Sequence, residues 1–353
     1  YKFRTRCDTE VILYAWQEWG EACVKRFRGM FAFALYDKTR QCLFLARDRL
    51  GIKPLFFSVL DGRTLAFGSE LKVLKAPPRL PRTLEAQAVE DYFALGYIPE
   101  PKTIYSGVFK LRPGHTLLVE RGKPVPQQHE YWDLPFTPIA IASEQELGDE
   151  LFARIREAVD IRMVAEVPLG AFLSGGVDSS AVVAAMAQLQ DTPVNTCAIG
   201  FDVPQFNETD FAREVAERYQ TNHLERIVAS DDFDLLDTLA QLYDEPYADS
   251  SAIPTYRVCQ LARERVTVAL SGDGGDENFA GYRRYRWHMN EERLRSALPL
   301  GIRKPIFGAL GRLYPKLDWA PRVFRAKTTF ESLARNSVEA YLHSVSLTSQ
   351  EQR

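Results

Sequence analysis

The sequence predicts a mixed α+β region followed by an α/β region built on a parallel sheet. In the first region, residues 29–57 contain two apolar, aromatic-rich segments separated by a polar turn at 37–40, which is typical of a β-hairpin. From residue 144 onward, apolar β-type runs alternate with amphipathic helical patterns, as in parallel α/β sheets. Residues 123–138 are rich in Pro, Gln and His and resemble a linker. We therefore expect two domains, 1–140 and 141–353.

The first region is expected to contain two helices and further short strands. Residues 9–20 and 84–95 have helical patterns, and Thr83 is a suitable N-cap for the second helix. Residues 64–67 and 115–120 are expected to be strands, the latter closed by a turn at 121–123. Together with the hairpin, these elements predict a mostly antiparallel arrangement.

The second region is expected to alternate regularly between helices and strands. Helices are expected at 144–163, 179–189, 208–219, 233–243 and 252–264. Strands are expected at 168–173, 195–201, 224–228 and 266–270. From residue 282 onward the pattern is helical and rich in Arg.

Composition excludes several classes of protein. The 353 residues are 46% hydrophobic and 26% charged, which is enough for two apolar cores and excludes a mainly disordered chain. The 44 basic and 47 acidic residues give a net charge of -3, so we expect neither nucleic acid nor a membrane surface as a partner. No apolar run approaches the roughly 18 residues of a membrane span. Five cysteines without CxxC spacing favour a reducing, cytoplasmic setting. The chain lacks an initiator Met, and we interpret it as a fragment.

A glycine- and serine-rich loop, SGGVDSS at residues 174–180, separates an expected strand from an expected helix. Two glycines allow a tight turn with inward N–H groups, and the helix start adds unpaired N–H groups and a positive dipole, which suits a phosphate. Asp178 in such a cradle would repel phosphate unless a cation intervenes, so we interpret it as a magnesium ligand. A plain turn with a serine N-cap is the alternative interpretation.

A second loop, SGDGGDENFAGY at residues 271–282, follows the expected strand 266–270. Asp273, Asp276 and Glu277 lie in this glycine-rich turn. Carboxylates at the carboxyl end of a parallel strand suit the counter-cations of a metal-bridged triphosphate. We expect the two loops to share one crevice. The identities of Asn278 and Ala280 in this loop are interpreted as neutral variation, without effect on the function of the loop.

These motifs resemble those of glutamine-hydrolysing asparagine synthetases. SGGVDSS, SGDGGDE and YDEPYADSSAIPTY are similar to the family's N-type ATP pyrophosphatase domain, which has a doubly wound parallel sheet. CDTEVIL, RGMFAFALYD, RDRLGIKPLFF and FGSELKVL resemble its class II glutamine amidotransferase domain, an N-terminal-nucleophile fold with antiparallel sheets, here truncated. The resemblance covers most of the chain. It implies conversion of aspartate to asparagine through β-aspartyl-AMP, with ammonia from glutamine and release of AMP and pyrophosphate.

The resemblance also implies roles for individual residues. ATP and Mg²⁺ would be the ligands, with Asp178 and Asp276 on the metal and Asp273 and Asp276 in catalysis. The nucleotide would be bound by residues of both loops and of the second strand of the sheet: Leu173, Ser174, Gly175, Gly176, Asp178, Ser179, Ser180, Ile199, Gly200, Ser271 and Gly272. For Leu173 and Ile199, a place in the sheet core is an equally good interpretation.

In the amidotransferase half, Asp8 matches the family acid that receives the glutamine amino group, and a helix N-cap is the alternative. The family's nucleophile is a cysteine at the mature N-terminus, which this sequence lacks. Cys7, Cys23 and Cys42 are interpreted as buried apolar residues instead.

The acceptor is the least determined feature. One bacterial branch of the family has an arginine where this chain has Ser250 and Ser251, so an amidotransferase acting on another carboxylate, for example in exopolysaccharide synthesis, is an alternative to aspartate amidation. A nucleotide-binding relative with an inactive glutaminase half is a third hypothesis.

The histidines do not have the spacing of metal ligands. Arg283, Arg284 and Arg286 are interpreted as a solvated helix face. The sequence is compatible with a homodimer.

Overall fold

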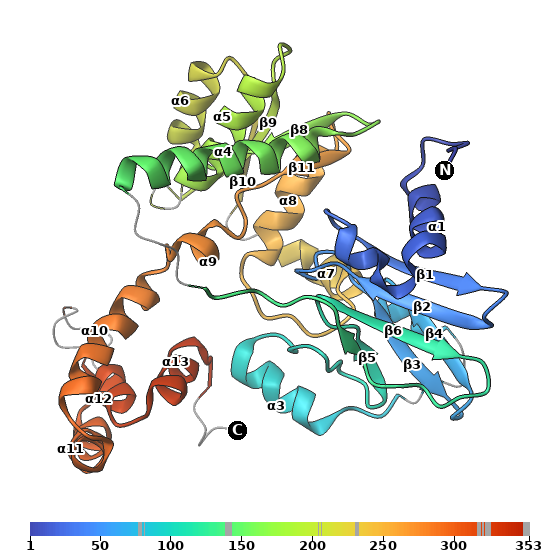
Figure 1. The fold of residues 1–353 in the computed structure, drawn as a ribbon. Helices are drawn as coiled ribbons and strands as arrows, with labels where there is room; N and C mark the ends of the chain where they lie inside the picture. Colours follow the sequence, from blue (N-terminus) through green and yellow to red (C-terminus); the bar gives the residue numbers. More distant parts are fainter. Residues whose placement is uncertain are drawn as a thin grey trace. The chain divides into compact units, whose positions relative to one another are not determined.

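The structure, a computed structural model, describes residues 1–76, 80, 82–137, 143–203, 205, 207–229, 233–315, 319, 321 and 326–348 (Figure 1). The expected domain boundary near residue 140 lies outside these residues. The chain divides into two compact units. Unit 1 comprises Tyr1–Ile139, Ala240–Ala248 and Leu347–Arg353, and unit 2 comprises Ala140–Leu239 and Asp249–Ser346. Unit 1 therefore includes two short segments, one between the two parts of unit 2 and one after them in the sequence.

Unit 1 contains two antiparallel sheets. The first has the order β1 (Ala32–Asp37), β2 (Cys42–Arg47), β6 (His115–Glu120) and β7 (His129–Glu130). The second has the order β4 (Thr64–Gly68), β3 (Phe56–Leu60) and β5 (Val108–Lys110). The predicted hairpin is confirmed, with Asp37 paired to Cys42. Strand β7 lies within the stretch interpreted as a linker, where His129 pairs with Thr116 of β6.

The helices of unit 1 are α1 (Asp8–Trp19), the 3-10 helix η1 (Gly20–Arg26), α2 (Leu71–Lys75) and α3 (Ala86–Leu95). The predicted N-cap of α3 is wrong: the cap is Glu85, not Thr83. Leu84 forms an antiparallel bridge with Tyr105, and the Thr83 carbonyl accepts a hydrogen bond of 2.9 Å from the Ser106 N–H. These tertiary contacts hold residues 83 and 84 in an extended conformation. Helix α3 therefore begins two residues later than predicted, at Ala86.

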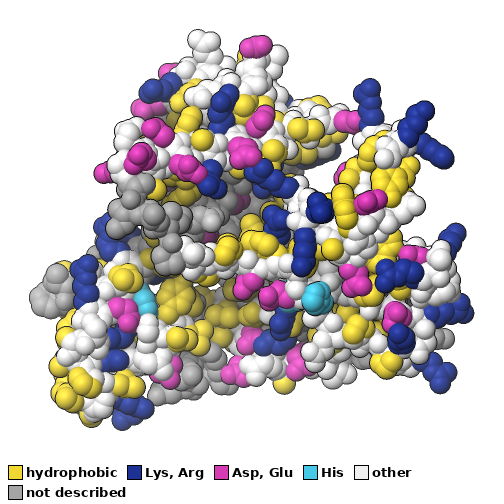
Figure 2. Space-filling view, viewed as in Figure 1, with side chains coloured by type: hydrophobic (Ala, Val, Ile, Leu, Met, Phe, Trp, Pro, Cys, Tyr) yellow, Lys and Arg dark blue, Asp and Glu magenta, His cyan; other side chains and the backbone are white. Residues whose placement is uncertain are grey.

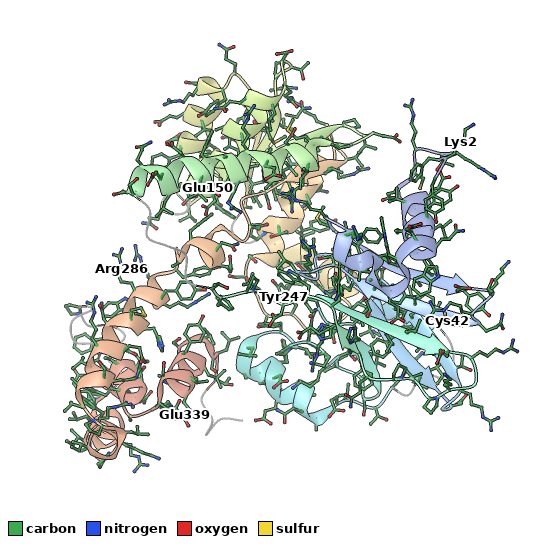
Figure 3. All side chains as sticks on the ribbon, in the orientation of Figure 1. Lys2, Cys42, Glu150, Tyr247, Arg286 and Glu339 are labelled. Carbon is green, nitrogen blue, oxygen red and sulfur yellow. The ribbon has the colours of Figure 1, made fainter. Side chains whose placement is uncertain are left out.

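The cysteines of unit 1 differ in burial. Cys23 and Cys42 are buried in the cluster formed by α1, β1 and β2, as predicted; Figure 3 labels Cys42. Burial raises the pKa of Cys23 to about 11, so this thiol stays protonated at neutral pH. Cys7 is exposed, so its interpretation as a buried residue was wrong. It precedes α1 as the N-cap and lies outside that cluster.

Unit 2 contains one parallel sheet with the order β10 (Asn222–Val228), β9 (Asn195–Phe201), β8 (Leu169–Phe172) and β11 (Val268–Leu270). All three neighbouring pairs are parallel. The chain moves from β8 through β9 to β10 and then returns to the other side of β8. This reversal is the doubly wound arrangement expected from the sequence, and it places a topological switch point between β8 and β11.

Helices cover both faces of the parallel sheet (Figure 1). One side carries α4 (Glu144–Met163), α5 (Val177–Leu189) and α6 (Thr209–Arg218), and the other carries α8 (Ala252–Ala262). Consecutive strand residues alternate between the faces: Ala171 joins the core of the first side, whereas Phe172 packs with Leu261 on the second. Helix α4 has the predicted bounds, and its start is fixed by a capping box between Ser143 and Glu146.

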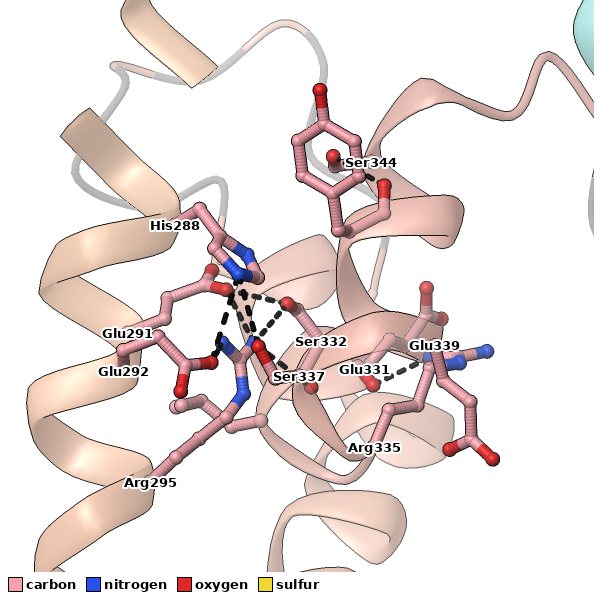
Figure 4. Close-up of polar contacts among 12 residues, drawn as sticks. His288, Glu291, Glu292, Arg295, Glu331, Ser332, Arg335, Ser337, Glu339 and Ser344 are labelled. Carbon is pink, nitrogen blue, oxygen red and sulfur yellow. Dashed lines mark hydrogen bonds and ion pairs between the residues drawn. The ribbon is translucent and has the colours of Figure 1, made fainter. Parts of the chain in front are cut away.

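The chain between β10 and α8 forms a short 3-10 helix, η3 (Phe233–Leu235), and α7 (Leu236–Leu242). Beyond β11 the chain is helical, as predicted, with α9 (Gly275–Phe279), α10 (Arg283–Ala297), α11 (Leu300–Leu313), α12 (Lys327–Leu333) and α13 (Ser337–Val345). Arg295 of α10 is buried and ties α10 to α12 (Figure 4). It contacts Glu291 at 2.7 Å, Glu292 at 2.5 Å and the Ser332 hydroxyl at 2.8 Å. This network is the polar centre of the helical part of unit 2.

The surface is mixed in charge. Acidic and basic side chains are interspersed on the face shown in Figure 2. Arg283, Arg284 and Arg286 are all exposed on α10, and Figure 3 labels Arg286. None of the helices in the described ranges combines the length and apolar character needed to cross a membrane.

Candidate functional site

Two loops leave the neighbouring parallel strands β8 and β11 at their carboxyl ends. Ala171 of β8 pairs with Leu270 of β11, so residues 173–176 and 271–274 emerge side by side at the switch point. In open α/β sheets this is the place where ligands bind, because the diverging connections leave a crevice there.

The first loop is held by its own hydroxyl groups. The Ser174 hydroxyl lies 3.0 Å from that of Ser179 and accepts a bond of 3.3 Å from the Gly176 N–H. The Ser180 hydroxyl donates to the Gly176 carbonyl at 2.7 Å. Gly175 has φ +81°, and an added Cβ would lie 2.5 Å from the Phe211 Cβ and 2.7 Å from the Ala212 nitrogen of α6. Only glycine can take this turn against α6 without a shift.

The second loop packs directly on the start of α5. A Cβ added at Gly272 would lie 2.6 Å from the Ser179 nitrogen and 2.9 Å from the Asp178 Cβ. A Cβ added at Gly275 would clash with the Asp178 carboxyl carbon. The glycines of the second loop are thus required by the close approach of the first, and this approach brings the carboxylates of both loops to one place.

A cavity of about 430 Å³ opens where the two loops meet. Eight of the residues expected to bind ATP, metal or substrate line it: Ser174, Gly176, Asp178, Ser179, Ser271, Gly272, Asp273 and Asp276. Glu277, the third carboxylate of the second loop, also lines it. The expectation that both loops share one crevice is therefore met by the geometry.

The other expected nucleotide residues are not among those lining this cavity. Leu173 is 1% exposed and packs in the core beneath the loop, and Ile199 packs on the opposite face with Leu261. Gly200 is buried, and an added Cβ would lie 2.6 Å from Asn207 Oδ1. Gly175 contacts α6 as described above. Ser180 directs its hydroxyl to the Gly176 carbonyl.

The carboxylate of Glu277 is paired with a phenol inside the cavity. The Tyr282 hydroxyl donates to Glu277 Oε1 at 2.6 Å, and both residues line the cavity. This hydrogen bond lowers the pKa of Glu277 and raises that of Tyr282. The Arg284 guanidinium lies 3.8 Å from the centre of the Tyr282 ring. Glu277 is therefore ionised at neutral pH and held at the cavity wall.

Asn278 and Ala280, which the sequence analysis interprets as neutral variation, both take part in the local structure of the second loop. The Asn278 side-chain amide donates to the Gly274 carbonyl at 2.6 Å, which fastens the second loop to α9. Ala280 has φ 55° and ψ 39°, the left-handed conformation that costs a residue with a Cβ about 1–2 kcal/mol. Next to it, a Cβ on Gly281 would clash with Asp276 Oδ1. This strained turn borders the Asp276 carboxylate.

The residues are suited to a magnesium ion. Asp178 and Asp276 line the same cavity as the glycine- and serine-rich first loop, and Mg²⁺ commonly takes one or two carboxylates together with substrate phosphates and water. Within the described ranges, no group of three or more His, Cys, Asp or Glu side chains is placed to hold a metal alone. Phosphate oxygens would have to complete the coordination.

Sequence reasoning did not single out six residues of the cavity wall. Thr255 and Val258 of α8 line it, and so do Phe172, Gly274, Gly275 and Tyr282. The segment YDEPYADSSAIPTY, which ends at Tyr256, was a signal for the first of these, but their convergence depends on how α8 packs below the sheet.

In unit 1, the predicted glutamine-binding residue Asp8 is exposed. It is the first residue of α1 rather than its N-cap, and its Oδ1 lies 3.5 Å from Cys7 Sγ and 3.4 Å from Thr9 Oγ1. A separate cavity of about 300 Å³ in unit 1 does not include it. Residues 243–247 line that cavity.

Two partly buried acids anchor the segment 240–248 in unit 1. Asp244 accepts the Leu71 N–H at 2.6 Å, and Glu245 accepts the Ile104 N–H at 2.7 Å. Glu245 also pairs with Lys110 at 2.6 Å. These bonds explain why residues far along the chain complete the first unit.

Comparison with known proteins agrees with these motifs. Residues 150–352 match the family model described as asparagine synthase, and residues 1–132 match that of a glutamine amidotransferase domain. A Methanocaldococcus jannaschii protein with the provisional name asparagine synthetase (glutamine-hydrolyzing) 2 is 38% identical over 97% of this chain and 66% of its own length. Asparagine synthetase (glutamine-hydrolyzing) 1 of Bacillus subtilis is 32% identical over 86% of this chain and 47% of its own length.

A third relative has a different name. The amidase chry2 of Gibberella zeae is 29% identical over 95% of this chain and 54% of its own length. The chain thus spans about half to two thirds of the length of these curated relatives. The asparagine synthase model matches more than half of the chain, including both loops of the cavity in unit 2. The chain belongs to the asparagine synthase family.

Proposed function

We propose that this chain carries the ATP-dependent, amide-forming centre of a glutamine-hydrolysing asparagine synthetase. The observation that carries the proposal is the meeting of the two glycine-rich loops, which gives one cavity a phosphate cradle on one wall and acidic side chains on the other.

ATP would place its phosphates against the first loop. Ser174, Gly176 and Ser179 line the cavity there, next to the start of the 13-residue helix α5, whose free N–H groups and dipole favour anions. The other residues predicted to bind the nucleotide would contribute backbone groups or hold the first loop in its conformation. They are Leu173, Gly175, Ser180, Ile199 and Gly200. Ser271 and Gly272 would close the site from the second loop.

A magnesium ion would be held by Asp178 and Asp276 together with phosphate oxygens. When bound, it would offset the negative charge of the phosphates. The chain's own contribution is to hold the two carboxylates in position: Asp178 lies against Gly275, and Asp276 lies against Gly281.

The reaction would begin with attack of a substrate carboxylate on the α-phosphorus of ATP. Pyrophosphate leaves with the electron pair of the broken P–O bond, which gives an acyl-adenylate. Ammonia then attacks the acyl carbon, the nitrogen loses a proton, and AMP leaves with the electron pair of the acyl C–O bond, which gives the amide. With aspartate as acceptor, the intermediate is β-aspartyl-AMP and the product is asparagine. Loop N–H groups would stabilise the charge that develops on the phosphate oxygens, and Asp273 and Asp276 would border the reacting atoms.

Ammonia would come from glutamine bound in the amidotransferase domain. Asp8 is the proposed partner of the glutamine amino group, since its carboxylate is exposed at the start of α1.

A second candidate function keeps the chemistry but uses another carboxylate. The relative named amidase chry2 supports this alternative, because a protein with a different name is 29% identical to this chain over 95% of the chain. Ser250 and Ser251 support it as well, since neither can form an ion pair with a substrate carboxylate.

The test is pyrophosphate release from ATP by the full-length protein with ammonia and a panel of carboxylates, aspartate first. Release with aspartate supports the leading proposal, and release only with another acid supports the second. Absence of release with every acid, together with retained ATP binding, would point to an inactive nucleotide-binding relative. Asp178→Asn should abolish release while leaving the far-UV circular dichroism unchanged, and wild-type rates in this variant would remove the metal assignment.

A further inference from the structure

The outward face of helix α11 is apolar, which is the reverse of the usual pattern for a surface helix. By the 3.6-residue period of an α-helix, exposed residues of α11 share one face, the apolar strip: Ile302, Pro305, Ile306, Ala309, Leu310 and Leu313. Ile302 and Ile306 are 52% and 53% exposed, and Leu313 is 83% exposed. Single exposed apolar residues are ordinary, but a contiguous strip marks a binding surface.

The opposite face of α11 holds the helix on the protein. Phe307 stacks on Phe330 of α12, with the ring centres 6.2 Å apart. The buried Arg303 guanidinium donates a hydrogen bond of 2.5 Å to the Leu333 carbonyl at the end of α12. These contacts fix α11 without using the apolar strip. In Figure 2, hydrophobic side chains gather at the lower left, where Figure 1 labels α11.

The charges beside the apolar strip are positive. Lys304 and Arg312 are exposed, and by the same helical period they lie along one edge of the strip. Helix α11 contains no acidic residue, and the two acids of α10, Glu291 and Glu292, both bind the buried Arg295. Helix α10 adds further exposed cations: Arg283, Arg284, Arg286 and Arg293.

This local charge differs from that of the whole chain. The net charge of -3 led us to expect no membrane surface as a partner, but that value is a sum over all residues. It does not describe α10 and α11, whose exposed charged side chains are basic. An anionic partner is therefore attracted to this part of unit 2.

An anionic lipid surface fits these features best. Ile and Leu side chains enter the boundary between headgroups and acyl chains, while Lys and Arg pair with anionic headgroups. A helix of 14 residues is about 21 Å long, so it can lie in the plane of a bilayer but is too short to span one.

Two other partners match the apolar strip less well. A single-stranded nucleic acid would need aromatic rings on which its bases stack, and the strip contains none. A second copy of the chain, packed strip against strip, would bring Lys304 and Arg312 close to the same cations of the other α11, with no acid on either helix to offset them.

We propose that α11 lies flat on an anionic membrane surface, with the apolar strip among the acyl chains and with Lys304 and Arg312 at the headgroups. The attachment is peripheral, because one short helix enters only the boundary layer of the bilayer. This inference concerns where the protein acts, and it does not depend on the reaction proposed above.

The test is co-sedimentation of the full-length protein with vesicles of phosphatidylcholine, either alone or mixed with phosphatidylglycerol. The wild type should sediment with the mixed vesicles and stay in solution with phosphatidylcholine alone. Ile306→Asp should lower the partition coefficient for mixed vesicles at least about tenfold, because it places a charge in the apolar strip. Lys304→Ala and Arg312→Ala should each lower it about fivefold and make it less sensitive to salt.

Leu147→Asp is the matched control. Leu147 lies on α4 and is 50% exposed, close to the value for Ile306, and this variant should bind vesicles as the wild type does. Both aspartate variants should keep the wild-type midpoint of urea unfolding. Without vesicles, both should also keep the wild-type rate of pyrophosphate release. Sedimentation is read without any turnover, so failure of the ligase proposal would not obscure this result.

Several results would overturn the inference. One is a wild-type protein that stays in solution with the mixed vesicles. Another is full vesicle binding by Ile306→Asp together with loss in Lys304→Ala, or equally tight binding of a single-stranded oligonucleotide, either of which would indicate a general polyanion site. A lower urea midpoint for Ile306→Asp than for Leu147→Asp would show that protein covers the apolar strip. A dimer in vesicle-free solution that only Ile306→Asp dissociates would identify a second copy as the partner.

Discussion

The side-chain amide of Asn278 donates a hydrogen bond of 2.6 Å to the carbonyl of Gly274. Gly274 has φ +89° and is the N-cap residue of α9, the helix that carries Asp276 and Glu277. This bond fixes the carbonyl at the bend of the second loop, and with it the direction in which the acidic side chains leave the helix.

Asn278→Ala should weaken the proposed site more than the fold. One net hydrogen bond at an exposed position contributes about 0.5–1.5 kcal/mol to the free energy of unfolding. We expect kcat/KM for pyrophosphate release to fall about tenfold, because the acids lose their fixed direction. Steady-state kinetics and urea unfolding would check this. Asn290→Ala, on the exposed part of α10, is the matched control and should change neither quantity.

Ala280→Gly should stabilise the protein. Ala280 is held at φ 55°, and glycine removes a steric cost of about 1–2 kcal/mol while adding about 0.5–1 kcal/mol of backbone entropy. The free energy of unfolding should therefore rise by up to about 1 kcal/mol, measured by urea titration. The opposite sign is expected for Ala153→Gly, an exposed position in the right-handed helix α4, which should lose about 1 kcal/mol.

Gly272→Ala should separate the two loops. The new methyl group would lie 2.6 Å from the Ser179 nitrogen, and that backbone atom cannot move without displacing α5. We expect a loss of about 1–3 kcal/mol in stability and at least a hundredfold loss of ATP-dependent activity. Gly301→Ala in α11, where an added Cβ meets nothing within 4 Å, should keep full activity. Normal turnover in Gly272→Ala would disprove the close contact of the loops.

Arg295→Ala should destabilise the helical part of unit 2. The Arg295 side chain is 3% exposed, and its removal takes away the guanidinium that binds both Glu291 and Glu292. Breaking a buried pair in this way costs about 3–5 kcal/mol, and the lower figure is expected because Glu292 keeps 32% of its surface in water. Thermal unfolding would report the change. Arg286→Ala, at an exposed position of the same helix, should stay within about 0.5 kcal/mol of the wild type.

His223 should make unit 2 less stable in mild acid. Burial lowers the pKa of His223 below its usual value of 6.5, and the charges of Arg213 and Arg265 act in the same direction against that of Glu225. The unfolded chain therefore binds the proton more tightly than the folded one. Stability is fully present above pH 6.5 and is lost as the pH falls through the folded pKa.

Urea unfolding at several pH values would measure this slope. His223→Gln should make the dependence shallower between pH 6.5 and 5. A slope should remain, because burial also lowers the pKa of His343. An unchanged slope in His223→Gln would mean that His223 does not titrate with folding.

Local sequence signals predicted the elements of unit 2 well. The bounds of α4 and β9 agree with the prediction to the residue, because a capping box marks the start of α4 and residues 197–201 of β9 carry no polar side chain. The meeting of the two loops was also predictable, since parallel strands end at one edge of a sheet. These features depend on residues that are close in sequence, or on a general rule of topology.

The predictions from sequence were wrong or incomplete where contacts between residues distant in sequence determine the structure. The start of α3 is set by the bridge from Leu84 to Tyr105, and the place of Tyr282 in the cavity wall is set by its bond to Glu277 across a turn. The strain at Ala280 is a backbone property that residue identity alone does not reveal. The fastening of Asp244 and Glu245 into unit 1 joins residues about 140 to 170 positions apart in sequence, and no local pattern encodes it.

The hydrogen bonds of Asp244 and Glu245 to unit 1 also limit how the chain can be divided into fragments that fold separately. A polypeptide ending near residue 140 would leave the backbone N–H groups of Leu71 and Ile104 without the acids that receive them. During synthesis on the ribosome, the first unit likewise cannot complete its packing until Leu347 has emerged, long after its own sheets are made. The chain passes between the two units more than once, so neither can be excised by a single cut.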